Sequence, residues 1–166
     1  MKDDNLIPDL VKVLKDSMSI KYPIKDMEEE VKKLKGKIIR DEKTVKPEIK
    51  GTEKGTFVII LPKDIKKEEE RYFVARELGY LFLHMGYLIN PVLFKDYNNK
   101  TFSDNMLETK LEAKEFALEF LMPTEEYIKY VRETFDKNIV DIVKIANHFV
   151  VPVSLALEKG EIINAM

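Results

Sequence analysis

The feature that most constrains the fold is the segment from Tyr72 to His84 (YFVARELGYLFLH), which is apolar on nearly every side when drawn as a helix. Such a helix has to be covered by other elements, so the rest of the chain must supply layers around it. Asp64 is a suitable N-cap, the acidic run Glu68 to Glu70 suits the positive end of a helix, and Gly86 is a suitable stop. The pattern therefore predicts a buried central helix.

The remaining segments predict an α+β fold with a small mixed sheet in the N-terminal half, packed on a helical bundle. With 166 residues and no linker, we expect one domain over residues 1–166, whose last part, 138–166, is a helical end-piece. Apolar spacing and turn residues predict strands at 37–40 and 56–61 (TFVIIL), a loop or a loose hairpin at 45–55, and a loop at 87–105. They predict helices at 5–17, 26–35, 107–122, 127–135 and 138–150, and a last helix after Pro152. Thr124 is the expected cap of the helix at 127–135, and Ser154 that of the last helix.

Composition narrows the possible functions. Hydrophobic residues make up 45% of the chain and charged residues 35%, and the net charge is −2, which gives no overall basic surface for nucleic acid. The chain has no cysteine, so disulfides and thiolate metal sites are excluded. The N-terminal stretch lacks the apolar core of a secretory signal, and no apolar run is long enough to cross a bilayer. We therefore expect a cytoplasmic protein.

Polar groups stand out on the predicted central helix. Arg76, Tyr80 and His84 recur every four residues and so share one face, and Glu77 lies beside them. Charges on a buried helix require partners, because an unpaired buried charge is costly. The central helix therefore predicts a polar site rather than a plain packing surface.

The helix at 107–122 offers carboxylates as partners, at Glu108, Glu112 and Glu115. Glu112 precedes an alanine in a tightly apolar stretch and is the one we expect to point inward. A buried ion pair between Arg76 and Glu112 would satisfy both groups and join the two helices. The alternative is that Arg76 reaches solvent at the mouth of a cleft and pairs with nothing.

Two phrases in the sequence resemble a known family. YFVARELGYLFLH followed by LEAKEFALEFLMP is similar to the ImmA/IrrE metallopeptidases, which typically show F-T-x-A-H-E-L-G-H-x-L-L-H and then E-A-x-x-F-A-x-x-L-L-M-P. The resemblance extends over residues 30 to 163 and is strongest over 56–123. It implies a zincin-like fold of the gluzincin type.

In that family two histidines and a downstream glutamate hold zinc, and the glutamate between the histidines acts on the bound water. The resemblance places Arg76 and Tyr80 at the two histidine positions, Glu77 at the general-base position, and Glu112, with Glu108 as the alternative, at the third ligand position. Arginine has no lone pair to give a metal, and the phenol of tyrosine is protonated at neutral pH. We therefore expect no cofactor. The alternatives are zinc held by atypical ligands, or a remnant metal site of His84 with Glu77 or Glu112.

Three further features have mainly structural readings. His84 is expected to bond to backbone, and His148 to pack or lie at the surface. The last two helices have the rhythm of a helix-turn-helix, but the second one, beginning at Ser154, has no Arg, Gln or Asn to read base edges. The strand 56–61 is a possible edge for adding an extended peptide.

The resemblance implies a regulatory role. We expect a non-catalytic pseudopeptidase that binds a protein partner, such as the transcriptional repressor of a bacterial phage or mobile element. The alternative is an active zinc metallopeptidase, and a third possibility is a nucleic-acid-binding regulator that uses its C-terminal helices. No membrane partner is expected, and the sequence leaves the oligomeric state open.

Overall fold

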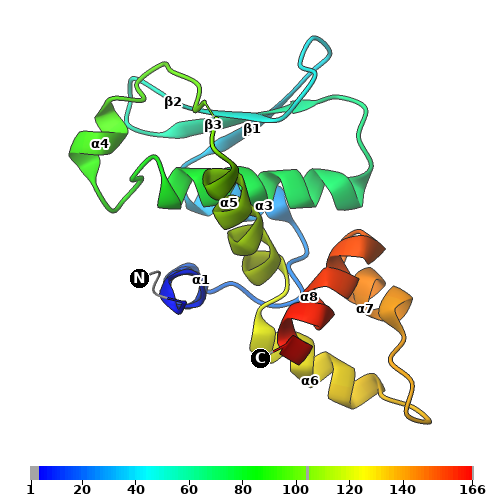
Figure 1. The fold of residues 1–166 in the computed structure, drawn as a ribbon. Helices are drawn as coiled ribbons and strands as arrows, with labels where there is room; N and C mark the ends of the chain where they lie inside the picture. Colours follow the sequence, from blue (N-terminus) through cyan, green and yellow to red (C-terminus); the bar gives the residue numbers. More distant parts are fainter. Residues whose placement is uncertain (1–3, 104, 166) are drawn as a thin grey trace.

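The computed structural model describes residues 4–103 and 105–165, and Figure 1 shows their arrangement. A three-stranded sheet lies on one side of the central helix, in the order β1-β3-β2. Strand β1 (Lys37–Asp41) pairs in parallel with β3 (Phe57–Pro62), and β2 (Glu48–Gly51) pairs with β3 in antiparallel orientation. The expected α+β fold with a small mixed sheet is confirmed.

Helix α3 (Lys67–Leu83) runs beneath the sheet, and α5 (Leu107–Leu121) crosses α3 and extends away from the sheet (Figure 1). These two helices form the most extensive helix–helix contact among the described residues. Around them lie α1 (Leu6–Met18), α2 (Met27–Lys33), α4 (Pro91–Lys95), α6 (Thr124–Thr134), α7 (Ile142–Phe149) and α8 (Val153–Ala165).

The strand β3 lies between β1 and β2, and its side chains alternate so that one face is completely buried. Phe57, Ile59 and Leu61 are all buried at 1% exposure or less and face the helical layer. The central helix is buried as predicted, with Val74, Ala75, Leu78 and Leu81 at its core. Burial on the sheet side and on the α5 side explains why this helix carries no single apolar stripe.

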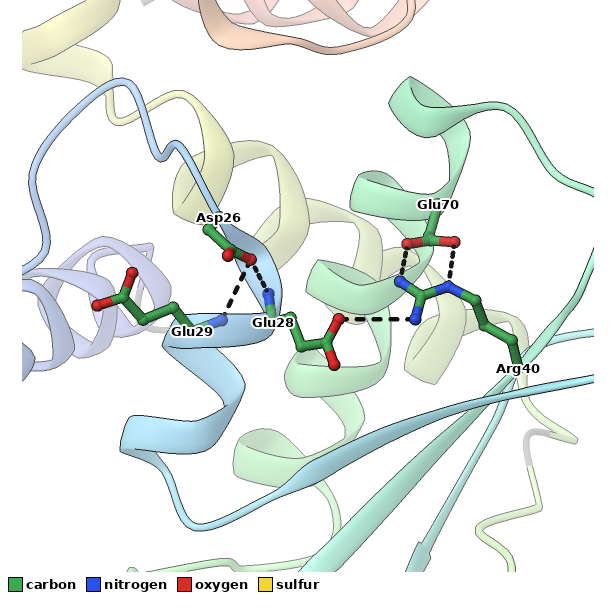
Figure 2. Close-up of polar contacts among 5 residues, drawn as sticks. All are labelled: Asp26, Glu28, Glu29, Arg40 and Glu70. Carbon is green, nitrogen blue, oxygen red and sulfur yellow. Dashed lines mark hydrogen bonds and ion pairs between the residues drawn. The ribbon is translucent and has the colours of Figure 1, made fainter.

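An ion-pair network ties the sheet edge to the helices (Figure 2). Arg40 on β1 makes a two-bond contact with Glu70 of α3 and lies 3.6 Å from the carboxylate of Glu28 on α2. Asp26 caps α2 by accepting hydrogen bonds from the backbone N–H groups of Glu28 and Glu29, at 2.9 and 3.3 Å. Since Arg40 is partly exposed, the network orients α2 against the strand more than it stabilises the fold.

The structure differs from the sequence prediction in several local details. Of the two interpretations of residues 45–55, a loop or a loose hairpin, the structure has the hairpin, because β2 pairs with β3 in antiparallel orientation. Residues 87–105 include the short helix α4, capped by Asn90. Asp64 does not cap α3, whose first turn follows Lys66. Thr124 and Ser154 are not caps either, because α6 begins at Thr124 itself and α8 at Val153.

Candidate functional site

The site is positioned by a close approach of α3 to α5. A Cβ atom at Gly79 would lie 3.0 Å from both the Cα and the carbonyl oxygen of Ala113, so only glycine fits at this crossing without displacement. Gly79 follows Glu77 by two residues and precedes Tyr80, while Ala113 follows Glu112 directly. The crossing therefore brings the polar residues of both helices into one region.

A cleft of about 1020 Å³ opens beside this region. One wall is α3 with the residues that precede it, the opposite rim is the β1–β2 connection with the start of β2, and the segments around 101–105 and 110–114 close the remaining sides. Four aromatic side chains and charges of both signs line it: Val45, Lys46, Pro47, Glu48, Pro62, Asp64, Ile65, Glu69, Tyr72, Phe73, Arg76, Glu77, Tyr80, Thr101, Phe102, Ser103, Asn105, Lys110, Leu111 and Lys114.

Arg76 and Glu77 form an ion pair within the cleft wall. The Nη2 of Arg76 donates a hydrogen bond of 3.0 Å to Oε1 of Glu77. The side chain of Glu77 is 3% exposed, whereas that of Arg76 is 24% exposed and reaches the cleft. The guanidinium also lies over the ring of Phe73, with 5.0 Å between its Cζ and the ring centroid, so its flat face is covered by an aromatic group.

Tyr80 fills the second position of the motif with a buried aromatic ring. Its residue exposure is 3%, and its ring stacks on that of Phe102 at a centroid distance of 5.0 Å. The ring of His84 lies 6.1 Å from the same Phe102 ring. Phe102 therefore packs over the face of α3 that carries Tyr80 and His84.

Glu112 faces His84. The Nε2 of His84 lies 3.3 Å from Oε2 of Glu112, and both side chains are about one-fifth exposed. The ion pair that the sequence suggested between Arg76 and Glu112 is therefore not the one that forms: Arg76 pairs with the adjacent Glu77, and Glu112 has His84 opposite it. The side-chain rotamer of Arg76 decides whether its guanidinium reaches Glu77 or Glu112. The spacing of residues in the sequence does not reveal that rotamer.

Of the residues that the sequence suggested for the cleft, Arg76, Glu77 and Tyr80 line it, whereas His84, Glu108 and Glu112 are not among its lining residues. Glu108 and Glu115 are exposed on α5, and neither lines the cleft. His148 lies on α7 with its ring stacked on that of Tyr130 at 3.7 Å, which agrees with the structural reading of this histidine.

Sequence reasoning missed the aromatic lining of the cleft. Phe73 stands three residues before Arg76, a spacing that places both on one helical face, so helix geometry could have revealed it. Phe102 comes from a connecting segment, and no local pattern indicates that it meets Tyr80.

The strand TFVIIL is not an edge, contrary to the sequence interpretation. It forms the central strand β3, paired on both sides. On the outer edge of β2, the backbone N–H of Phe102 donates to the carbonyl of Ile49 at 2.8 Å, and that of Asn99 donates to the carbonyl of Gly51 at 3.0 Å. The chain itself therefore occupies much of the β2 edge, and the part near Glu48 faces the cleft.

The residues at the three family ligand positions do not fit zinc. Arg76 is a cation without a lone pair, Tyr80 is buried against an aromatic ring, and Glu112 is turned toward His84. Within residues 4–103 and 105–165, no three His, Cys, Asp or Glu side chains come together in a group that could hold a metal ion. In place of metal ligands, these positions hold an ion pair, Arg76 with Glu77, and a packed aromatic ring, Tyr80 on Phe102.

Comparison with known protein families identifies the family to which this fold belongs. The sequence model of the IrrE N-terminal-like domain, which defines peptidase family M78, matches residues 21–159, well over half of the chain. The chain belongs to the ImmA/IrrE family. The zincin-like fold expected from the two sequence phrases is thereby confirmed for this ImmA/IrrE domain.

A solved structure shares the fold. It is described as a Mycobacterium tuberculosis transcriptional regulator, and it matches with a TM-score of 0.57 and 14% sequence identity. The match covers 90% of this ImmA/IrrE chain and 44% of the regulator, so the chain spans less than half of that protein. The search of curated proteins gives no significant match. No helix in the described part of the chain is both long and apolar enough to cross a membrane.

Proposed function

We propose that this ImmA/IrrE domain is a non-catalytic pseudopeptidase that binds a protein partner, a repressor-type transcriptional regulator. The observation that supports this most strongly is the ion pair of Arg76 and Glu77. It places a permanent cation where the family has its first metal ligand, and a cation repels a divalent metal.

The same contact removes the second requirement for hydrolysis. A general base must be within hydrogen-bond reach of the water that it activates. Glu77 occupies the general-base position but is 3% exposed, and one of its carboxylate oxygens accepts a hydrogen bond from Arg76. The retained glutamate serves the ion pair, and its role is structural.

What remains of a peptidase is the cleft. Its volume of about 1020 Å³ and its aromatic lining suit a segment of another protein chain. A protein that keeps a peptide cleft without hydrolysis can sequester a regulator or compete for it. The similarity in fold to a protein described as a transcriptional regulator supports the regulatory setting.

The experiment mixes this chain with repressor-type regulators from the same genome and measures complex formation by size-exclusion chromatography. The partner is then recovered and its intact mass determined. The proposal predicts a complex in which the partner keeps its full mass, with and without added zinc. A partner shortened by cleavage would establish the peptidase alternative, and a salt-sensitive shift of duplex DNA without any protein complex would establish the nucleic-acid alternative.

A further inference from the structure

The guanidinium of Arg76 has more hydrogen-bond donors than Glu77 uses. An arginine side chain carries five N–H groups. One of these, on Nη2, is given to Glu77, and the Nε of Arg76 is buried without an acceptor among the residues that the structure describes. The side chain also lines the cleft and is 24% exposed. The buried Nε is closed to a ligand that enters the cleft, but the exposed part of the guanidinium has donors that Glu77 does not use, and an incoming oxygen ligand would accept from these.

Charges are unevenly placed around the cleft. The basic groups Lys110 and Lys114 come from α5, and the acidic groups Glu48, Asp64 and Glu69 come from the sheet rim and the residues around the start of α3. One further ammonium group, that of Lys46 on the β1–β2 connection, lies on the sheet rim. On that side three carboxylates outnumber the single ammonium of Lys46, so a carboxylate ligand is less favoured there than beside Arg76.

On the basic side, one of the two lysines is already neutralised. The ammonium of Lys114 lies 2.8 Å from the carboxylate of Glu158 on α8. No acidic partner lies within ion-pair distance of Lys110 in the described parts of the chain, and its side chain is exposed. Arg76, Lys110 and the exposed Lys46 are thus the cations of the cleft that can attract an anionic group, while Glu77 offsets part of the charge of Arg76. Of these three, Arg76 is the one whose side chain is mostly buried and packed against an aromatic ring.

The aromatic surroundings favour a charged hydrogen bond at this point. Phe73 covers one face of the guanidinium, and the ring of Tyr80 lies 6.0 Å from its Cζ. A hydrogen bond between ionised groups is stronger where water is excluded, and the planar fork of arginine matches a carboxylate with two parallel bonds.

We propose that the cleft binds a carboxylate of an extended peptide, with Arg76 as its principal donor and with the neighbouring side chain of the peptide against Phe73 and Tyr80. The inference rests on the proposed function, because it names the chemistry by which the pseudopeptidase recognises its partner. The carboxylate comes either from an acidic side chain or from a free C-terminus.

The test uses three N-acetylated hexapeptides, each with a phenylalanine. The first is C-terminally amidated with a central glutamate, the second has a free C-terminus and no acidic side chain, and the third is amidated with glutamine in place of glutamate. Binding is followed by NMR through the backbone amides and the arginine Nε–H signals, which come from Arg40, Arg71, Arg76 and Arg132. We expect at least one carboxylate peptide to bind roughly tenfold more tightly than the glutamine peptide and to shift the Arg76 signal.

Variants separate a binding role from a structural one. Arg76→Gln should reduce the affinity for the carboxylate peptide to that of the glutamine peptide. If that variant fails to fold, Arg76→Gln/Glu77→Gln removes both charges of the pair and serves in its place. Arg40→Gln removes an equal charge outside the cleft lining, from the network in Figure 2, and should leave the affinity unchanged.

Three results would overturn the inference. The first is equal affinity for all three peptides, and the second is no binding by any of them. The third is a loss of carboxylate binding in Arg40→Gln as large as that in Arg76→Gln. The two peptides with a carboxylate identify its source. Failure here is distinct from failure of the proposed function, which is tested by complex formation with a regulator and by the intact mass of that partner, and not by peptide charge.

Discussion

Arg76 and Glu77 are consecutive residues on α3, and their side chains meet at 3.0 Å in the wall of the cleft. The carboxylate is almost completely buried, and the guanidinium lies between it, the Phe73 ring and the cleft. In the ImmA/IrrE family these two positions belong to a metal ligand and a general base. Here the two groups bind each other, and the remaining predictions depend on this contact and on the helix packing that positions it.

Substituting Arg76 with alanine should destabilise the fold. Removing the cation takes a hydrogen bond from the buried carboxylate of Glu77, and we expect a loss of about 1–3 kcal/mol in the free energy of unfolding. Arg40→Ala is the matched control, since Arg40 forms a more exposed pair with Glu70, and it should cost about 0–1 kcal/mol. Urea unfolding followed by circular dichroism measures both. Equal losses in the two variants would argue against a special role for the Arg76 contact.

Substituting Gly79 with alanine should also destabilise the protein, although alanine is the better helix former. The added methyl group would lie 3.0 Å from backbone atoms of Ala113, so α3 and α5 would have to separate, and we expect a net loss of about 1–3 kcal/mol. Because the obstacle includes backbone atoms, a second change, Ala113→Gly, should not restore stability. A more stable Gly79→Ala protein in thermal unfolding would show that the helices are not in close contact here.

The buried side chain of Arg71 joins α3 to two distant segments. It donates hydrogen bonds to the carbonyls of Ile24, Phe149 and Val150, at 2.8, 3.2 and 3.0 Å. Arg71→Met keeps much of the side-chain volume but leaves these carbonyls without their donor, so we expect a loss of about 2–4 kcal/mol in unfolding free energy. Hydrogen exchange should rise in α7, whose C-terminal carbonyls Arg71 holds. Unchanged exchange in α7 would contradict this link.

His148 should make stability depend on pH. Burial lowers the pKa of His148 below its ordinary value of 6.5, opposed by the nearby charges of Glu133 and Glu126. The unfolded chain then binds the proton more readily than the folded one, so stability is fully present above pH 6.5 and decreases as the pH falls through and below that value. Between pH 7.5 and 5.5, the melting temperature should fall more for the wild type than for His148→Gln. Parallel curves for the two proteins would refute the prediction.

The long elements could be predicted from the sequence because their patterns are strong. The apolar run of α3, the helical spacing of α5 and the β-branched strand β3 each have one consistent interpretation. Strand β2 could be predicted only as part of a loose hairpin and without bounds, since Ile49 is its single buried apolar side chain, between Glu48 and Lys50. Its conformation depends on pairing with β3 and with the segment around Phe102, and these contacts come from distant parts of the chain.

At the site, the sequence predicted which residues share a helix face but not which groups pair. Helical periodicity placed Arg76 beside Tyr80, and the cleft confirms that neighbourhood. Arg76 pairs with Glu77 and not with Glu112. This choice of partner depends on side-chain rotamers and on the angle at which α3 crosses α5, which the sequence pattern does not give. Family resemblance identified the positions, and their chemistry in this chain follows from the contacts.

The most direct test of the central claim is the zinc content of the purified chain, measured by elemental analysis after incubation with zinc and removal of the excess. The variant Arg76→His/Tyr80→His, which rebuilds the family motif, is the matched control and should retain about one zinc per chain if the fold is preserved. We predict that the wild type retains no stoichiometric zinc. About one zinc per wild-type chain would contradict the account, because it would mean that other residues hold the metal despite the Arg76–Glu77 pair.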